Sequence, residues 1–149
     1  MESEQKSDEF FMRSALGEAR KALERGEVPI GAVVVCGGTV VGRGHNLVET
    51  LGDATAHAEM QAVTAAAATL GGKYLNECTL YVTVEPCVMC AGACAWSQVG
   101  RVVYGAADPK RGFLRFGPSL LHPRTVLCGG VLEEECSRLV TQFFAALRR

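Results

Sequence analysis

Residues 79–90 read TLYVTVEPCVMC, and this stretch decides the fold. Five of its first six residues are β-branched or aromatic, a composition typical of a buried strand. Pro86 then fits the first turn of a helix that reaches about Trp96, because the N–H that proline lacks would have no partner there. A strand followed by a helix is a unit of α/β domains, so the α/β class is predicted.

Upstream of this stretch, the spacing of apolar residues predicts two helices and a hairpin. Serine, threonine and aspartate favour helix starts, glycine favours helix ends, and a glycine pair favours a two-residue turn. The predicted elements are a helix capped by Asp8 and ended by Gly26, a strand over 30–35, a turn at Gly37-Gly38, a second strand from Val40 that closes at 44–46, and an alanine-rich helix over 56–70.

Downstream, the pattern predicts two short strands, a long loop and a final amphipathic helix. The strands span 102–105 and 126–128, the loop between them spans 106–124, and the helix carries an apolar stripe of Leu132, Cys136, Leu139, Val140, Phe143, Phe144 and Leu147. A loop of this length is expected to have a function. Strands separated by helices, with an opening hairpin, predict a mixed sheet between helices.

Composition and charge limit the classes of protein to which this sequence can belong. The 149 residues fit one domain, spanning 1–149, that can bury a core without disulfides. No apolar run approaches the roughly 20 residues of a membrane span, and the acidic first ten residues do not resemble a secretory signal. A cytoplasmic protein without a membrane partner is therefore expected. The seven cysteines are odd in number and include a C-x-x-C pair, which favours reduced thiols and a metal.

Charge is unevenly distributed along the chain. Residues 1–100 hold 7 Lys+Arg and 12 Asp+Glu, a net of −5, whereas residues 101–149 hold 8 and 4, a net of +4. Such an imbalance fits either a local phosphate-binding patch or ordinary solvated faces.

A candidate metal site is formed by two short motifs. Cys87 and Cys90 are three residues apart, so at a helix start both sulfurs project to one side and can share a tetrahedral Zn²⁺. The positive end of the helix dipole favours their thiolate form. His57 supplies the third ligand if the two helix starts converge at one edge of the sheet. One zinc ion per chain is expected.

Glu59 is the candidate catalytic residue. It lies two residues after His57 and can point over the open fourth position of the metal without binding it. The combined pattern H-x-E…P-C-x-x-C is the signature of zinc-dependent nucleobase deaminases, in which the glutamate is the general acid and base. A redox pair does not explain His57 and Glu59. Cys94 is excluded as a fourth ligand because it lies about 10.5 Å along the helix from Cys87.

The segments EVPIGAVVV (27–35), TAHAEM (55–60), TLYVTVEPCVMCAGA (79–93) and GRVVYGAADPKRG (100–112) resemble the bacterial tRNA adenosine deaminases over nearly the whole chain. The resemblance implies a three-layer α/β/α domain with a five-stranded mixed sheet, the cytidine deaminase-like fold. It also implies a homodimer that converts the wobble adenosine of a tRNA anticodon loop to inosine. By position, Asn46 would hydrogen-bond the flipped base, Asp108, Lys110 and Arg111 would lie on the RNA-facing loop, and Phe144 near the anticodon loop.

The expected reaction is hydrolytic. Zinc-bound hydroxide attacks C6 of adenine, while Glu59 moves the protons and ammonia leaves. Two alternatives remain open at this point: a deaminase of a free base or nucleoside such as guanine, cytosine or cytidine, and a non-catalytic zinc module for protein interaction. A zinc module for protein interaction would leave Glu59 without a function. Outside the motifs, Asn46 could simply end a strand, Phe144 could be core, and Lys110-Arg111 could be solvated loop charge.

Overall fold

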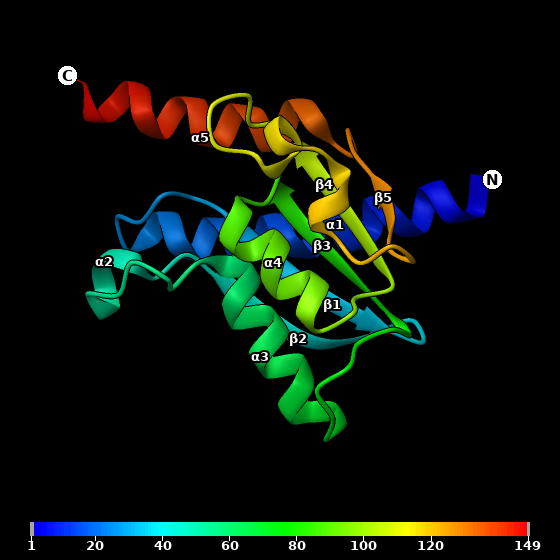
Figure 1. Ribbon diagram of the computed structural model, residues 1–149. Coiled ribbons are helices and arrows are strands. Elements are labelled where there is room, and N and C mark those ends of the chain that lie inside the picture. The colour runs from blue at the N-terminus through cyan, green and yellow to red at the C-terminus, as the bar shows by residue number, and fades with distance from the viewer. Residues whose placement is uncertain (1, 149) are drawn as a thin grey trace.

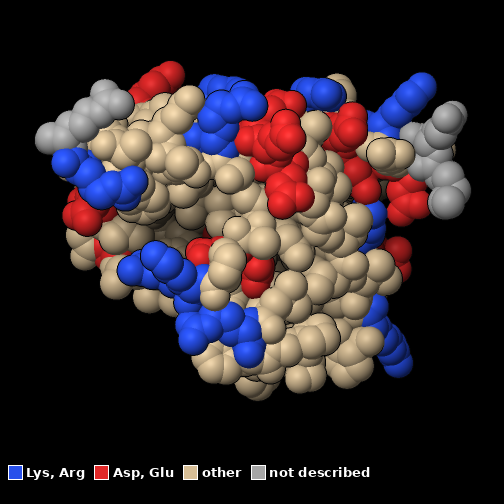
Figure 2. Space-filling view, turned by 90° about the horizontal axis from the view of Figure 1, so that it is seen from above, with Lys and Arg blue, Asp and Glu red and all other residues tan. Residues whose placement is uncertain are grey.

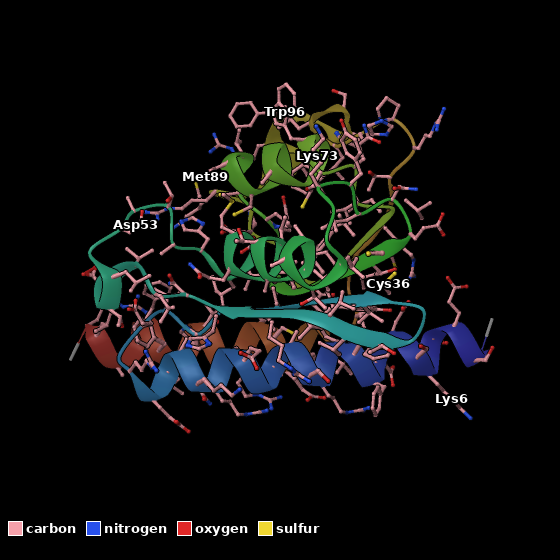
Figure 3. The ribbon with its side chains drawn as sticks, turned by 90° about the horizontal axis from the view of Figure 1, so that it is seen from below. Lys6, Cys36, Asp53, Lys73, Met89 and Trp96 are labelled. Atoms are coloured by element: carbon pink, nitrogen blue, oxygen red, sulfur yellow. The ribbon has the colours of Figure 1, made fainter. Side chains whose placement is uncertain are left out.

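A computed structural model describes residues 2–148. Five strands form one sheet in the order β2-β1-β3-β4-β5, with α3 and α4 on one face and α1 and α5 on the other (Figures 1 and 3). The elements are α1 (Glu2–Glu24), β1 (Gly31–Cys36), β2 (Thr39–His45), α2 (Val48–Leu51), α3 (Ala58–Leu70), β3 (Cys78–Val84), α4 (Val88–Trp96), β4 (Arg101–Ala106), the 3-10 turns η1 (Phe113–Phe116) and η2 (Pro118–Leu120), β5 (Val126–Cys128) and α5 (Glu133–Leu147). The predicted three-layer α/β/α architecture is confirmed.

The sheet is mixed, as expected. β1 pairs antiparallel with both β2 and β3, whereas β3, β4 and β5 run parallel. The hairpin between β1 and β2 turns through Gly37 and Gly38, whose φ angles of 59° and 77° suit a two-residue turn that twists with the strands. Along β1, Ala32 and Val34 pack with the α3 and α4 layer, and Val33 packs with α1.

Small residues bring α3 directly onto β2. A Cβ at Gly44 would lie 2.3 Å from the carbonyl oxygen of Ala58, so only glycine allows this approach. Ala58, Ala62 and Ala66 form the buried face of α3. The alanines that favour a helix in the sequence are therefore also the residues that let the helix pack closely, and this packing places the start of α3 beside the end of β2.

The expectation that Asp8 caps the first helix is wrong. α1 begins at Glu2, because residues 2–7 include several good helix formers, and Asp8 lies in its interior. The buried Asp8 carboxylate instead accepts hydrogen bonds from the Arg101 guanidinium at 2.7 Å and from the Tyr81 hydroxyl at 2.8 Å. It joins α1 to β3 and β4 through contacts that local sequence does not reveal.

The smaller differences concern Pro86, the short helical elements and the end of α5. Pro86 precedes α4 instead of occupying its first turn, because Cys87 is the N-cap. The short helix α2 was not predicted, and the loop after β4 contains η1 and η2. In α5 only Cys136 is buried, and Phe144 is 39% exposed, so the end of the apolar stripe is not core. Within residues 2–148, every helix is too short or too polar to span a bilayer.

Candidate functional site

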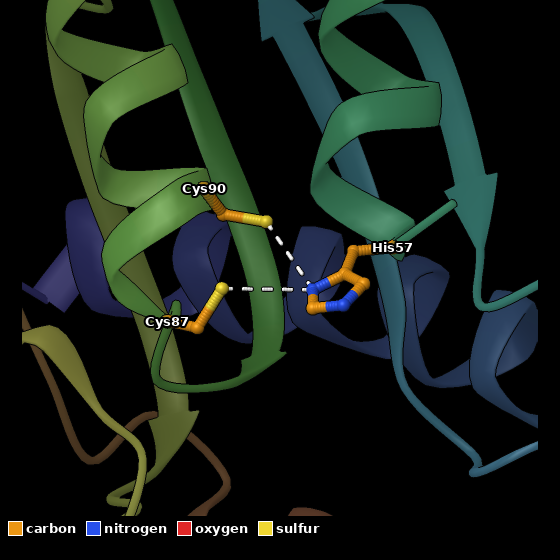
Figure 4. Close-up of side chains that lie close together, drawn as sticks. All are labelled: His57, Cys87 and Cys90. Atoms are coloured by element: carbon orange, nitrogen blue, oxygen red, sulfur yellow. Dashed lines mark hydrogen bonds between the residues drawn. The ribbon is translucent and has the colours of Figure 1, made fainter. Parts of the chain in front are cut away.

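The starts of α3 and α4 converge beside the end of β3, and each presents its first residues to the other (Figure 4). His57 is the N-cap of α3, Cys87 is the N-cap of α4, and Cys90 lies in the first turn of α4. The convergence predicted from the two motifs is therefore present, and it rests on α3 packing against β2 and on α4 following β3 after three residues.

The three side chains have the geometry of a tetrahedral zinc site. Nδ1 of His57 lies 3.6 Å from the sulfur of Cys87 and 3.6 Å from the sulfur of Cys90. With Zn–S bonds of about 2.3 Å and a Zn–N bond of about 2.0–2.1 Å, a tetrahedral angle puts sulfur and nitrogen about 3.6 Å apart. All three ligand atoms lie within 4.8 Å of one another. Two sulfurs and one imidazole nitrogen fit zinc and leave a fourth position open.

The local electrostatics favour metal binding. The hydrogen bond with Cys90 lowers the pKa of Cys87 to about 4, with a further contribution from His57, although burial opposes this. The same hydrogen bond and burial raise the pKa of Cys90. The hydrogen bond with Cys87 raises the pKa of His57, despite its partial burial. Zinc binds cysteine as the thiolate, so metal binding would release the protons that the two sulfurs still hold.

Glu59 lies in the first turn of α3 and is only 4% exposed. Burial raises the pKa of Glu59 to about 7, although interaction with Cys90 opposes this shift. Glu59 is not one of the three clustered metal ligands. A buried carboxyl group whose pKa lies near neutrality can take up and release protons at neutral pH.

Cys94 does not belong to the metal-binding cluster of the described residues. It is fully buried one turn further along α4, and burial raises the pKa of its thiol to about 12. Its place outside the cluster agrees with the expectation that Cys94 is not a fourth ligand, which stays a prediction.

Asn46 lies just after β2 and is nearly buried. Its Oδ1 accepts a hydrogen bond from the backbone N–H of Val48 at 3.1 Å, and its Nδ2 donates to the carbonyl of Val28 at 3.4 Å. Each half of a primary amide can make two hydrogen bonds, so these two bonds leave one donor and one acceptor of the Asn46 amide unused.

The loop after β4 carries three predicted RNA contacts. Asp108 is half-buried, and its Oδ1 accepts hydrogen bonds from the backbone N–H groups of Lys110 and Arg111 at 3.2 and 3.1 Å. The side chains of Lys110 and Arg111 are exposed. Gly112 forms an isolated antiparallel bridge with Cys87, which brings this loop beside the metal ligands.

Phe144 belongs to a different layer of the fold from the metal ligands. It lies on α5, on the face of the sheet opposite α3 and α4, and packs edge-to-face against Phe143 with ring centroids 5.3 Å apart.

Figure 2 looks onto the end of the molecule where β3 and β4 finish, and it shows Lys and Arg side chains gathered beside a hollow.

Two buried carboxylates near the site were not singled out from the sequence. Glu27 accepts hydrogen bonds from the backbone N–H groups of Glu49 and Thr50 at 3.1 and 2.6 Å. Glu85 does the same for two residues of the loop after β4. The only local signal is a glutamate close to a proline at a strand boundary, in EVP and EPC.

Comparisons with known proteins agree with this site. Residues 5–106 match the cytidine and deoxycytidylate deaminase zinc-binding region. The tRNA-specific adenosine deaminase of Bacillus subtilis is 48% identical over 147 residues, covering 95% of this chain and 91% of that protein. A structure from a study of A-to-I editing by tRNA:A34 deaminases at the wobble position is 42% identical, covers 87% of this chain and 98% of that one, and has a TM-score of 0.82.

A guanine deaminase from Nitrosomonas europaea is also similar, with 26% identity, a TM-score of 0.83, and coverage of 92% of this chain and 84% of that one. The two structures are thus almost equally alike in fold, and the higher identity is with the tRNA-editing enzyme. The chain belongs to the zinc-dependent cytidine and deoxycytidylate deaminase family and, within it, to the tRNA-specific adenosine deaminases.

Proposed function

We propose that this protein deaminates the wobble adenosine of a tRNA anticodon loop and so forms inosine. The observation that carries the proposal is the site itself, a three-ligand zinc geometry with a buried glutamate beside it. Near-half identity to a tRNA-specific adenosine deaminase along 95% of the chain supports adenosine in tRNA as the substrate. An enzyme with this substrate would work in the cytoplasm.

The residues divide the chemistry between binding and proton transfer. His57, Cys87 and Cys90 would hold zinc, which polarises a water molecule so that it is a nucleophile at neutral pH. Glu59 accepts a proton from the attacking water and delivers it to N1 of adenine as the new C–O bond forms at C6. It then transfers the second proton from the C6 hydroxyl to the amino group. The C–N bond breaks, ammonia leaves, and a carbonyl remains at C6.

Asn46 would orient the base in this reaction. Its two backbone hydrogen bonds fix the plane of the amide, which leaves one N–H and one oxygen lone pair for the polar edge of the purine. A positioned amide discriminates between substrates because an analogue without the matching group leaves a buried polar atom unpaired.

The loop after β4 would meet the RNA around the target. Lys110 and Arg111 are exposed, close in sequence to Gly112, which bridges to Cys87. Exposed cations beside the reacting base suit the phosphates of a single-stranded loop, whose bases are already partly unstacked. Asp108 orders this segment through its own backbone hydrogen bonds.

A homodimer is part of the proposal. The sequence of α4, VMCAGACAW, has no charged residue, and a helix that is apolar all round is normally buried. One face of α4 nevertheless points outward, with Val88 45% and Trp96 86% exposed and Gly92 between them. Figure 3 shows Met89 and Trp96 directed away from the sheet. A second copy of the chain, seated on this face, would bury it.

The alternative is a deaminase of a free base, which the likeness to a guanine deaminase favours. Turnover should be compared on an anticodon stem-loop RNA with adenosine at the wobble position and on free adenosine, cytidine and guanine. We expect the stem-loop to have the highest kcat/KM. A higher value on guanine or cytidine would contradict the RNA substrate and leave the zinc chemistry standing.

A further inference from the structure

A buried carboxylate connects the metal site to the loop that would contact RNA. Glu85 follows β3 directly and precedes Pro86 and Cys87. It is only 7% exposed, and its own backbone N–H donates to the carbonyl of Ala106 at 2.8 Å, which extends the pairing of β3 with β4 by one residue. The backbone of Glu85 is therefore held at the edge of the β3–β4 pair, and its side chain is buried.

The two oxygens of Glu85 bind the two ends of one loop. Oε1 accepts a hydrogen bond from the backbone N–H of Asp108, and Oε2 accepts one from the backbone N–H of Leu114, each at 3.0 Å. Hydrogen bonds to an ionised carboxylate are stronger than those between neutral groups. A single side chain thus closes the segment 108–114, which carries Lys110 and Arg111, onto the end of β3.

Gly112 shows how closely the loop fits the carboxylate. A Cβ at this position would lie 1.9 Å from Oε2 of Glu85 and 2.6 Å from the carbonyl oxygen of Asp108. The backbone N–H of Gly112 donates to that same carbonyl at 2.8 Å, and the N–H of Phe113 donates to the carbonyl of Pro86 at 2.9 Å. The loop is therefore folded around the carboxylate and tied to the residue that precedes Cys87.

The two exposed cations take no part in this anchoring. No ion pair among the described residues includes Glu85, Lys110 or Arg111. The side chains of Lys110 and Arg111 are exposed, while their backbone N–H groups bind Oδ1 of Asp108. The loop is thus ordered through hydrogen bonds to its backbone, and its positive side chains remain available for a ligand.

We propose that Glu85 is a positioning residue that pre-forms the loop 108–114 for RNA. This inference rests on the proposed function. A loop that is already ordered loses less conformational entropy when it binds, so affinity for RNA rises without a direct contact from Glu85. Glu85 would therefore act on RNA binding through Lys110 and Arg111, and would leave the proton transfers to Glu59.

The test is the variant Glu85→Gln in the full chain. An amide keeps the size of the carboxylate but replaces one oxygen with NH₂, so a donor faces the backbone N–H of either Asp108 or Leu114 where an acceptor stood. We expect the KM for the stem-loop RNA to rise about tenfold, with kcat within about threefold of wild type and zinc still at one per chain. Amide hydrogen exchange at Asp108 and Leu114 should become faster in the RNA-free protein.

Gly112→Ala is the second variant, and it should give the same KM-selective defect by displacing the carboxylate. Glu24→Gln, at an exposed end of α1, and Gly72→Ala, where a Cβ would meet nothing within 4 Å, are the matched controls and should leave both KM and exchange unchanged.

A fall in kcat at unchanged KM, or unchanged amide exchange in both Glu85→Gln and Gly112→Ala, would overturn the inference alone. A wild-type protein that does not turn over the stem-loop at all would overturn the proposed function as well, so the two failures are distinguishable.

Discussion

The Asp8 carboxylate accepts hydrogen bonds from both terminal nitrogens of the Arg101 guanidinium, Nη1 and Nη2, at 2.7 Å each. This bidentate pair connects the second turn of α1 to the first residue of β4. Burial disfavours the charged form, but the hydrogen bonds from Arg101 and Tyr81 outweigh it and hold the pKa of Asp8 below its ordinary value. The pair therefore stabilises the layer of α1 against the sheet.

We expect Asp8→Asn to lower the free energy of unfolding by about 2 kcal/mol at pH 7, because it removes a charged acceptor from a nearly buried pair. The pKa of Asp8 is lower in the folded state, so this stabilisation is complete above the unfolded-state pKa of about 4 and is lost as the pH falls below it. Denaturant unfolding at pH 7 and pH 3 should show the difference between wild type and variant shrinking at acid pH.

The control for this prediction is Glu9→Gln, which breaks an exposed pair with Arg13 at 3.9 Å and should cost no more than a few tenths of a kcal/mol. Equal losses for the two variants would contradict the stabilising role of Asp8.

The sequence predicted the elements of the fold well where the signal was local. The strand at 79–84 and the hairpin turn at Gly37-Gly38 were both predicted, because composition and turn chemistry act within a few residues. Asp8 was misjudged because its partner, Arg101, is 93 residues away in the chain. A residue type that favours helix starts was instead used for a buried tertiary contact.

The candidate site also contains residues that the sequence could predict and residues that it could not. His57, Cys87 and Cys90 could be predicted because each motif opens a helix, and tetrahedral coordination requires the two motifs to meet. The roles of Glu27 and Glu85 could not be predicted. Their partners are backbone N–H groups 22–29 residues away, and a backbone group carries no signal in the sequence.

Glu59→Gln should keep one zinc ion per chain and lose turnover by about 10²- to 10⁴-fold, because the carboxyl moves protons and does not hold the metal. Metal analysis by mass spectrometry and single-turnover kinetics measure the two effects separately. Cys87→Ala is the paired control and should lose zinc and activity together. If Glu59→Gln lost its zinc, or stayed within a few-fold of wild-type turnover, the assigned role would be wrong.

Replacing Lys110 and Arg111 together with alanine should weaken RNA binding and flatten its dependence on salt. Each lost phosphate contact on a single strand reduces the log–log salt slope by about 0.7. Binding of the stem-loop at several salt concentrations gives the slope, and the double variant Lys6→Ala with Lys73→Ala removes the same charge elsewhere on the surface. The prediction fails if both double variants bind with the wild-type slope.

Trp96→Glu should convert the protein to a monomer, because a charge on the exposed apolar face of α4 cannot be buried against a second copy without a partner. Light scattering should give twice 15.9 kDa for wild type and about 15.9 kDa for the variant. Phe10→Glu is the control, since Phe10 is 63% exposed on α1, which packs on the opposite face of the sheet. A wild-type mass of one chain would end the dimer proposal.

The most direct test of the central claim is to map inosine by mass spectrometry in a stem-loop that carries adenosine at the wobble position and at a second position of the loop. The wild-type protein should form inosine at the wobble position only, and Glu59→Gln should form almost none. No inosine in the RNA, or equal conversion of both adenosines, would contradict the account.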